Sequence, residues 1–521
     1  MTTLTRATAV LVIALSLAGC GATATRSAPP RAESPGAVPA MPLAENAVAD
    51  AVARLDEMAE QLMSTSGIPG MAVGVVHGGK TVYARGFGVR DTRTGQKVDA
   101  DTVFQLASLS KPLSATVVAQ QVGAGAIRWD TPIVDKLPWF ALSDTAATAR
   151  VTVGDLFAHR SGLPEHAGDL LEDLGYDRRT ILQRLRLVPL GPFRASYAYT
   201  NFGVTAAAEA VAADRDWERL CDDVLYRPLG MASTSSRFAD FAARPNRAVG
   251  HVRVPGAEGG YQPLHTRDPD PQSPAGGVSS SVNDLARWLE MMLADGRHDG
   301  GQLIAPAALL PALTPQMVSS PPAEPAERTG FYGYGFNIST SAAGRVQFSH
   351  SGAFLLGAAT NFVIIPDADV AIVALTNAAP SGIPETLTAQ FTDLVEFGEI
   401  RQNWLELYRD AFAEIDRPLG ELAGQPAPAD PAPARPLPAY VGRYANDYFG
   451  PATVTADADR LTLTLGARPQ TFELAHRDGD VFTFDIGSEN APPGSVSAVT
   501  VGADTMKLEF FDADGMGTFT R

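Results

Sequence analysis

Phe104-Gln-Leu-Ala-Ser-Leu-Ser-Lys-Pro-Leu-Ser-Ala115 places the hydroxyl of Ser108 three positions before the amine of Lys111. The apolar residues that follow predict a helix beginning near Ser108, where Pro112 does little harm because a first-turn residue needs no backbone N–H. Residues three apart share a helix face, so the Lys111 amine can reach the Ser108 oxygen and take its proton. A serine activated in this way is a nucleophile for covalent catalysis.

Two later segments support this interpretation, since the spacing alone is common. Tyr199-Thr200-Asn201 leads into an apolar helical pattern, and His350-Ser351-Gly352 ends a short strand-like run. In this order the three motifs resemble the signature of serine enzymes related to class C β-lactamases and penicillin-binding proteins. The resemblance spans roughly Leu55 to Asn377 and includes the flanking stretches 156–164, 227–231 and 275–287.

The resemblance implies an α+β fold of the β-lactamase and DD-peptidase kind. An antiparallel sheet flanked by helices would join a helical subdomain, with the nucleophile in the cleft between them. The residue patterns agree, because strand-like runs stand at both ends of a domain at 46–395 and mostly helical patterns fill 129–311. Strands are expected at 70–77, 80–87, 333–337, 346–350, 359–365 and 370–377, and helices at 48–62 and 387–415.

The resemblance also implies a role for each matching residue. Ser108 would be the nucleophile and Lys111 its base, which requires burial or a nearby charge to lower the lysine pKa towards about 7 to 8. Tyr199 would relay the proton to the leaving group, and Asn201 would orient Lys111 and contact the substrate amide. His350 replaces the lysine of the β-lactamases, and because histidine is mostly neutral near pH 7, this weakens the prediction of carboxypeptidase or β-lactamase activity.

An oxyanion and substrate site is expected beside the nucleophile. The backbone N–H groups of Ser108 and Ala353 would bind the oxyanion. Ser351 and Gly352 are expected to belong to the substrate-binding site, where Gly352 would let the substrate backbone approach closely.

Four nearby residues are weaker candidates. Ser110 points off the lysine face of the helix, and Tyr197 is expected to pack inward. His159 and His166 flank the loop 161–165 and are expected to support it rather than to form a metal or triad site. Because the eight histidines are dispersed, we predict no metal and no cofactor, and the lack of a Gly-x-Ser-x-Gly elbow argues against an α/β-hydrolase.

The N-terminus predicts export. Ala9–Ala18 has the length of a signal-peptide core and is too short to span a bilayer. Leu17-Ala-Gly-Cys20 resembles the lipobox of bacterial lipoproteins, although a cut after Ala22-Thr-Ala24 is an alternative. We therefore expect a protein of the bacterial cell envelope, on its periplasmic or outer-membrane face, with a lipoprotein signal peptide at 1–19, membrane attachment through lipidated Cys20 and a flexible tether at 20–45.

Charge and cysteine content exclude other classes. The net charge of −17 argues against nucleic acid as a partner, since phosphate binding needs a basic surface. Apart from Cys20, the sequence has only Cys221, which makes no intramolecular disulfide and is expected to be buried and unreactive. A hydrophobic content of 45% is enough for the cores of two or more domains.

The C-terminal part predicts a second domain. A helix and a Pro- and Ala-rich linker at 396–437 precede a run of short strands at 438–521, of which 460–465 alternates cleanly between polar and apolar residues. This pattern indicates a small all-β barrel and resembles the lipocalin-like module of some β-lactamase-related hydrolases. We expect it to pack beside the cleft or to form an oligomer contact.

The sequence thus predicts a serine hydrolase that acylates Ser108 with a peptide, amide or ester carbonyl and then hydrolyses the acyl-enzyme. The substrate would be a small molecule or a peptide. The alternative is a lipoprotein that binds penicillin or cell-wall peptides with little turnover, and a third hypothesis, a purely structural lipoprotein, leaves the three motifs unexplained.

Overall fold

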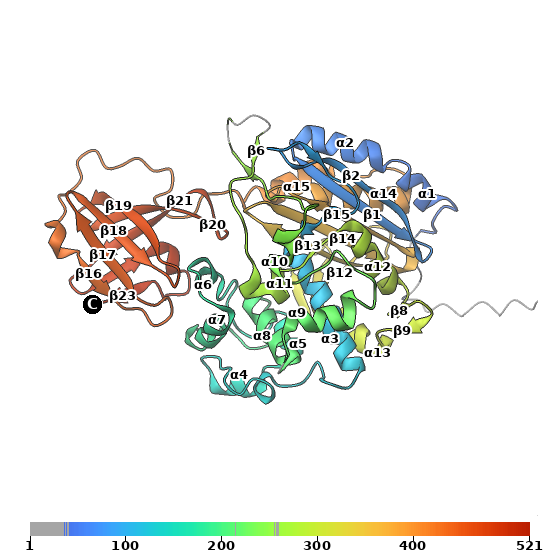
Figure 1. Cartoon of the computed structure of the whole chain (residues 1–521), viewed down its shortest axis with the longest axis horizontal. Coiled ribbons are helices and arrows are strands. Elements are labelled where there is room, and N and C mark those ends of the chain that lie inside the picture. The colour runs from blue at the N-terminus through green and yellow to red at the C-terminus, as the bar shows by residue number, and fades with distance from the viewer. Residues whose placement is uncertain (1–35, 37, 39–40, 214, 255, 257–259) are drawn as a thin grey trace, which may run out of the picture.

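One antiparallel sheet joins both ends of the larger domain in the computed structural model, which describes residues 36, 38, 41–213, 215–254, 256 and 260–521. β1 (Gly70–His77) pairs with β15 (Val370–Thr376), so segments far apart in the sequence lie side by side near its middle (Figure 1). The sheet confirms the predicted α+β fold. Its order is β10-β11-β12-β13-β14-β15-β1-β2-β3, with the other strands at Lys80–Asp91 (β2), Gln96–Lys97 (β3), Met317–Ser320 (β10), Gly330–Tyr332 (β11), Asn337–Thr340 (β12), Val346–Phe354 (β13) and Ala358–Ile365 (β14).

Helices cover both faces of this sheet. All residues of β15 are buried, which explains its run of apolar residues without polar alternation. One face packs against α1 (Ala47–Val52), α2 (Leu55–Ser66) and α14 (Ile383–Phe397), whose side chains share a core with the strands. The core on the other face includes α12 (Val282–Leu293) and α3 (Ser110–Gly123).

Two predicted helices are wrong in extent. The expected helix 48–62 is two helices, α1 and α2, and its periodicity continues across the turn because both bury side chains in the core shared with α14. The expected helix 387–415 is interrupted at Gly398, whose left-handed backbone (φ +74°) ends α14. A separate helix, α15 (Trp404–Phe412), follows.

The predicted strand 333–337 is wrong, because residues 333–336 form the turn between β11 and β12 and Asn337 begins β12. Gly335 has φ +79°, a backbone conformation that favours glycine. A Cβ added there would lie 2.8 Å from the carbonyl oxygen of Lys111. The turn therefore packs directly on the first turn of α3, which would exclude a side chain at this position.

The middle of the chain forms the predicted helical subdomain, which lies beside the sheet (Figure 1). Short helices joined by Gly and Pro loops predominate. They are α4 (Thr145–Arg150), α5 (Val153–Phe157), α6 (Asp169–Asp173), α7 (Arg178–Arg184), α8 (Asn201–Ala212), α9 (Trp217–Cys221), α10 (Phe238–Ala243), α11 (Ser273–Gly276) and α13 (Pro306–Leu309), with short strand pairs β4–β7 (Phe104–Gln105 and Ser279–Ser280), β5–β6 (Val252–Arg253 and Tyr261–Gln262) and β8–β9 (Arg297–His298 and Gly301–Gln302).

A second, eight-stranded antiparallel sheet forms the C-terminal barrel. Its strands pair in sequence order, and a bridge between Ala445 and Thr520 joins the two ends, so the barrel is nearly closed. Leu461, Leu463 and Leu465 point into its core, as the alternation predicts. The strands are Gly442–Tyr444 (β16), Ala452–Asp457 (β17), Arg460–Leu465 (β18), Gln470–Asp478 (β19), Val481–Ser488 (β20), Ala491–Val501 (β21), Thr505–Leu508 (β22) and Thr518–Thr520 (β23).

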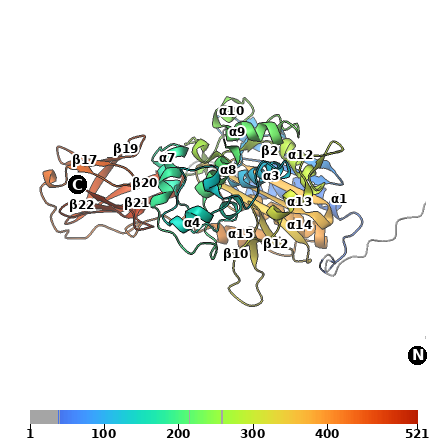
Figure 2. The same ribbon diagram turned by 90° about the horizontal axis from the view of Figure 1, so that it is seen from below.

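The barrel lies at one end of the molecule, next to α6 and α7 of the helical subdomain (Figures 1 and 2). Tyr176 donates a hydrogen bond of 2.8 Å to the Phe449 carbonyl, and the Gln470 amide donates to the Asp173 carbonyl. These contacts fix the barrel against the subdomain that borders the cleft.

The predicted signal peptide at 1–19 and the lipidation site Cys20 lie outside the described residues. Met41 already contacts the folded domain, since its carbonyl accepts a hydrogen bond of 2.6 Å from Arg345 Nη2. Cys221 is buried, and burial raises the pKa of its thiol, as expected for an unreactive cysteine. Among the described residues, helices of the length and apolar character needed to cross a bilayer are absent.

Candidate active site

Ser108 lies in a 3-10 turn, Ala107–Leu109, rather than in the first turn of α3, which begins at Ser110. The residue before it, Ala107, has φ +48°. This left-handed conformation is strained for alanine, and such strain is typical of positions that present a functional side chain. The sequence predicted the helix but not the 3-10 turn that directs Ser108 into the cleft.

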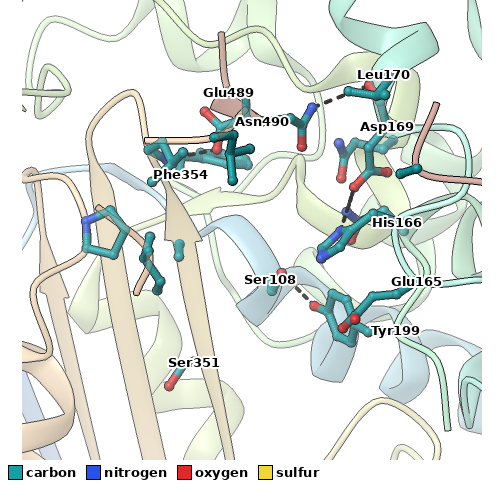
Figure 3. A pocket seen from close by; sticks show the side chains of 18 of the residues that line it. Ser108, Glu165, His166, Asp169, Leu170, Tyr199, Ser351, Phe354, Glu489 and Asn490 are labelled. Carbon is teal, nitrogen blue, oxygen red and sulfur yellow. Dashed lines mark hydrogen bonds and ion pairs between the residues drawn. The ribbon is translucent and has the colours of Figure 1, made fainter. Parts of the chain in front are cut away.

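Ser108 Oγ lies between two other polar groups. Lys111 Nζ is 3.0 Å from it, and the Tyr199 hydroxyl donates to it at 2.7 Å (Figure 3). Lys111 Nζ also donates to Asn201 Oδ1 at 2.7 Å and to the Ala275 carbonyl at 3.0 Å. The first two motifs therefore converge on one oxygen atom, and Asn201 holds the amine as expected.

Burial determines the protonation states of Lys111 and Tyr199. Lys111 is fully buried, which lowers the pKa of its amine to about 7, although the carboxylate of Asp169 opposes the shift. Burial raises the pKa of the Tyr199 phenol, so this group is neutral near pH 7 and acts as a hydrogen-bond donor. Lys111 is thus the group of the pair that can accept a proton at neutral pH.

Asp169 and two histidines support this network. Asp169 Oδ2 accepts a hydrogen bond of 2.9 Å from Asn201 Nδ2. It also pairs at 2.9 Å with His166 Nδ1 (Figure 3). The buried His159 ring lies 4.5 Å from the Tyr199 ring, and its Nδ1 accepts a hydrogen bond of 3.1 Å from the backbone N–H of Thr200. From the sequence, both histidines were expected to support only the loop 161–165. Asp169 was not predicted, although the His166-x-x-Asp169 spacing was an available signal.

The third motif lies on β13, with His350 buried at its centre. His350 Nδ1 lies 2.6 Å from the Ser351 carbonyl, which requires an N–H there, so Nε2 accepts the hydrogen bond of 2.8 Å from the Tyr332 hydroxyl. Burial, together with the charge of Lys111, lowers the pKa of His350 to about 3. This side chain is therefore neutral at physiological pH and supplies no positive charge to a substrate.

Gly352 brings β13 against the turn that carries Ser108. A Cβ added at Gly352 would lie 2.2 Å from the Leu106 carbonyl oxygen and 3.0 Å from the Ser108 backbone nitrogen. The following residue, Ala353, lines the cleft. Ser351 Oγ accepts a hydrogen bond of 3.0 Å from Asn361 Nδ2, and its hydroxyl points away from Ser108 (Figure 3).

The two neighbouring candidates have structural contacts. Ser110 Oγ donates to the Ala107 carbonyl at 2.6 Å and accepts from the Val278 N–H at 2.9 Å, so it braces the turn before α3. Tyr197 lines the cleft, and its ring packs against His159 at 5.6 Å between ring centroids.

These groups line a cleft of about 910 Å³ between the sheet and the helical subdomain. Its lining includes the carboxylates of Glu165, Asp169 and Asp514. Arg267 also lines it, but its Nη2 is paired with Glu172 at 2.6 Å. Besides Asp514, five further lining residues come from the barrel and could not be placed from the sequence: Glu489, Asn490, Glu509, Phe510 and Ala513.

Residues 55–395 match the model of the beta-lactamase family. The chain belongs to this family. Penicillin-binding protein 4 of Amycolatopsis lactamdurans is 28% identical over 383 residues, which cover 72% of this chain and 91% of that protein. Unguisins hydrolase ungD of Aspergillus violaceofuscus is 25% identical over 84% of this chain and 83% of its own length, and esterase EstB of Burkholderia gladioli is 27% identical over 67% and 95%.

The family match and these relatives together show that the chain is a serine hydrolase of the β-lactamase-related family. Among solved structures, the octameric penicillin-binding protein homologue from Pyrococcus abyssi matches with a TM-score of 0.59 and 19% identity over 90% of this chain and 100% of that one. This likeness supports the fold. Residues 426–519 match a family described as a domain of unknown function, DUF3471.

Proposed function

We propose that the protein hydrolyses esters or amides through an acyl-enzyme on Ser108, with Lys111 as the base. The observation that carries this proposal is the position of Ser108 Oγ, 3.0 Å from Lys111 Nζ and 2.7 Å from the Tyr199 hydroxyl, in a cleft. Neutral Lys111 directs its two hydrogens to Asn201 and Ala275, which leaves its lone pair for the Ser108 proton.

The chemical steps follow from these contacts. Lys111 takes the Ser108 proton as Oγ attacks the carbonyl carbon, and the backbone N–H groups of Ser108 and Ala353 stabilise the oxyanion. The proton then passes through Tyr199 to the leaving group as the bond to it breaks. In the second step a water molecule loses a proton to the same groups as its oxygen bonds to the acyl carbon. The bond from this carbon to Ser108 Oγ then breaks, Oγ takes the proton, and the acid is released.

We further propose that the substrate needs no free carboxylate beside the scissile bond. The position that holds a lysine in β-lactamases carries His350, which is buried and neutral, with a pKa of about 3. Arg267 is already paired with Glu172, and Glu165 and Asp514 add negative charge to the lining. A carboxylate would therefore find repulsion rather than a cation, which favours ester or amide substrates with neutral or positively charged flanks.

Ser108→Ala tests the nucleophile. Turnover of p-nitrophenyl esters and of D-amino-acid amides should fall at least about 10⁴-fold, because the covalent step is lost. Ser110→Ala is the matched control and should retain turnover if it folds. Undiminished rates in Ser108→Ala would reject the proposal.

A pair of peptides tests the carboxylate claim. One ends in D-Ala-D-Ala with a free carboxylate, and the other carries the same sequence as a C-terminal amide. We expect the amide to be cleaved at least as fast as the acid. A preference of about 100-fold for the free acid would contradict the claim and favour a carboxypeptidase.

We also propose that Cys20 carries a lipid that attaches the enzyme to the bacterial cell envelope. The support is the sequence Leu17-Ala-Gly-Cys20 after an apolar signal core. Cys20→Ala should move the protein from the membrane fraction to the soluble fraction and abolish labelling with a fatty-acid analogue. Equal membrane binding and labelling of both forms would contradict this assignment.

A further inference from the structure

The β20–β21 hairpin of the barrel enters the catalytic cleft. Its turn residues, Glu489 and Asn490, both line the cleft. Glu489 lies beside Phe354 at the end of β13, whereas Asn490 is directed towards the segment that carries Asp169 (Figure 3). One turn of the second domain therefore contacts both sides of the site.

On the sheet side, Glu489 holds the turn that follows β13. Its carboxylate accepts hydrogen bonds from the backbone N–H groups of Leu355 at 2.8 Å and Leu356 at 3.3 Å. This turn begins two residues after Ala353, whose N–H is assigned to the oxyanion. A shift of the turn would move that N–H relative to Ser108.

Arg267 extends this contact to the helical side. Its side chain is 8% exposed, and its Nε lies 3.8 Å from Glu489 Oε2 while its Nη2 pairs with Glu172 at 2.6 Å. The guanidinium also lies 5.2 Å from the centre of the Phe354 ring. A buried charge needs such partners. Arg267 therefore connects Glu489 to Glu172, which lies in α6.

On the helical side, Asn490 holds α6. Its Nδ2 donates to Asp173 Oδ2 at 2.8 Å and to the Asp169 carbonyl at 3.5 Å. Asp169 begins α6, and its side chain holds Asn201, which in turn accepts from Lys111. Asn490 is thus connected to the base through a short series of hydrogen bonds.

We propose that the Glu489–Asn490 turn is a positioning element of the active site, which fixes the strand that carries Ala353 relative to the helix that carries Asp169. This inference rests on the proposed function, because it requires Ser108 and Ala353 to act on the substrate. The barrel is then part of the catalytic unit rather than an appended domain. Since a misplacement of about 1 Å can lower a rate about 100-fold, loss of these contacts should be visible in catalysis.

The experiment compares Glu489→Ala, Glu489→Gln and Asn490→Ala in the full chain. Glu473→Gln is the control, since its side chain is 67% exposed on β19 and pairs with Arg460 on the barrel surface. Each variant is measured for kcat and KM with a p-nitrophenyl ester, for melting temperature, and for the dissociation constant of an aryl boronic acid. The boronate forms a tetrahedral adduct with a serine and therefore depends on the oxyanion site.

We expect Glu489→Ala to lower kcat about 10- to 100-fold with little change in KM, and to weaken boronate binding in parallel. Asn490→Ala should lower kcat about tenfold, and Glu489→Gln should recover most of the activity because its amide oxygen still accepts from the turn. Glu473→Gln should match the parent. A merely structural role would lower the melting temperature without the parallel change in boronate binding.

The inference is overturned if Glu489→Ala and Asn490→Ala are within about twofold of the parent, or if activity falls only in proportion to the folded fraction. If Glu489→Ala does not fold, Asn490→Ala decides by the same measurements. A Ser108→Ala variant measured alongside separates the two proposals. Activity that survives Ser108→Ala refutes the proposed function, whereas an inactive Ser108→Ala with unaffected hairpin variants refutes this inference alone.

Discussion

Two groups of residues line the cleft, and they come from different domains of the chain. Ser108, Lys111 and Tyr199 belong to the beta-lactamase family domain and make contacts with one reacting oxygen. Glu489 and Asn490 come from the C-terminal barrel and hold the backbone on either side of that oxygen. In the proposed mechanism the first group supplies the nucleophile, the base and the proton donor, while the second group fixes the distance between the elements that carry them.

The proposed reacting groups and the groups that hold them in position thus come from different domains. Lys111 is buried, and its pKa is about 7 because burial disfavours the ammonium. The barrel residues instead bind main-chain and carboxylate groups that do not react. Variants of the first group should therefore remove the chemical step, and variants of the second should slow it by smaller factors.

Replacement of the base should have the largest effect. Lys111→Met fills a similar volume but cannot accept the Ser108 proton, so kcat/KM should fall about 10⁴-fold. Lys136→Met, at an exposed lysine, is the matched control and should leave activity unchanged. Initial rates with a p-nitrophenyl ester measure both, and a Lys111→Met enzyme with more than a tenth of the parent rate would refute the assignment of the base.

A side chain at Gly352 should be nearly as damaging. Gly352→Ala places a Cβ 2.2 Å from the Leu106 carbonyl, which must displace β13 from the nucleophile turn and disturb the oxyanion site. We expect kcat to fall about 10³-fold. In the control Gly301→Ala the new Cβ would be 3.6 Å from its nearest neighbour, so kcat should equal that of the parent. Equal rates for Gly352→Ala and the parent would show that catalysis does not require the close approach of β13 to the Ser108 turn.

Loss of the phenol should have an intermediate effect. Tyr199→Phe removes the hydroxyl that donates to Ser108 Oγ, and kcat should fall about 10²- to 10³-fold. Tyr197→Phe, in the same cleft, is the control and should change kcat less than about threefold. If the two variants behave alike, the proton does not pass through Tyr199.

The smallest expected effect is a shift in pH dependence. The rate with a neutral ester should rise through the pKa of Lys111, at about 7, because the ammonium that predominates at lower pH cannot act as a base. Asp169 stabilises that ammonium, so Asp169→Asn should lower the pKa and move the midpoint to lower pH, by less than about one unit. A profile of log kcat/KM from pH 5 to 9 measures this. A midpoint that moves to higher pH would contradict the charge interaction.

The sequence predicted the chemical group better than the geometry around it. Two motifs predicted that Ser108, Lys111 and Tyr199 lie together, as they do in the structure, and apolar runs located most of the central strands. The turn at 333–336 was predicted as part of a strand, but Gly335 adopts a left-handed backbone conformation there and packs on Lys111.

The barrel contribution could not be predicted, because nothing in the local pattern around Glu489 marks it as part of a site. Its role depends on how the barrel docks against α6 and the end of β13, which is a property of tertiary structure. The same holds for Asp169, whose contact with Asn201 joins positions 32 residues apart. Residues that hold a site together leave weaker sequence signals than residues that react.

Mass spectrometry of the enzyme, quenched with acid during turnover of an ester, tests for the acyl-enzyme on Ser108. We expect the intact protein to gain the mass of the acyl group, the added mass to map to the peptide containing Ser108, and this mass to disappear when the substrate is exhausted. Rapid turnover with an acyl group on a different residue, or with a Ser108 peptide that never changes mass, would contradict the proposed acyl-enzyme.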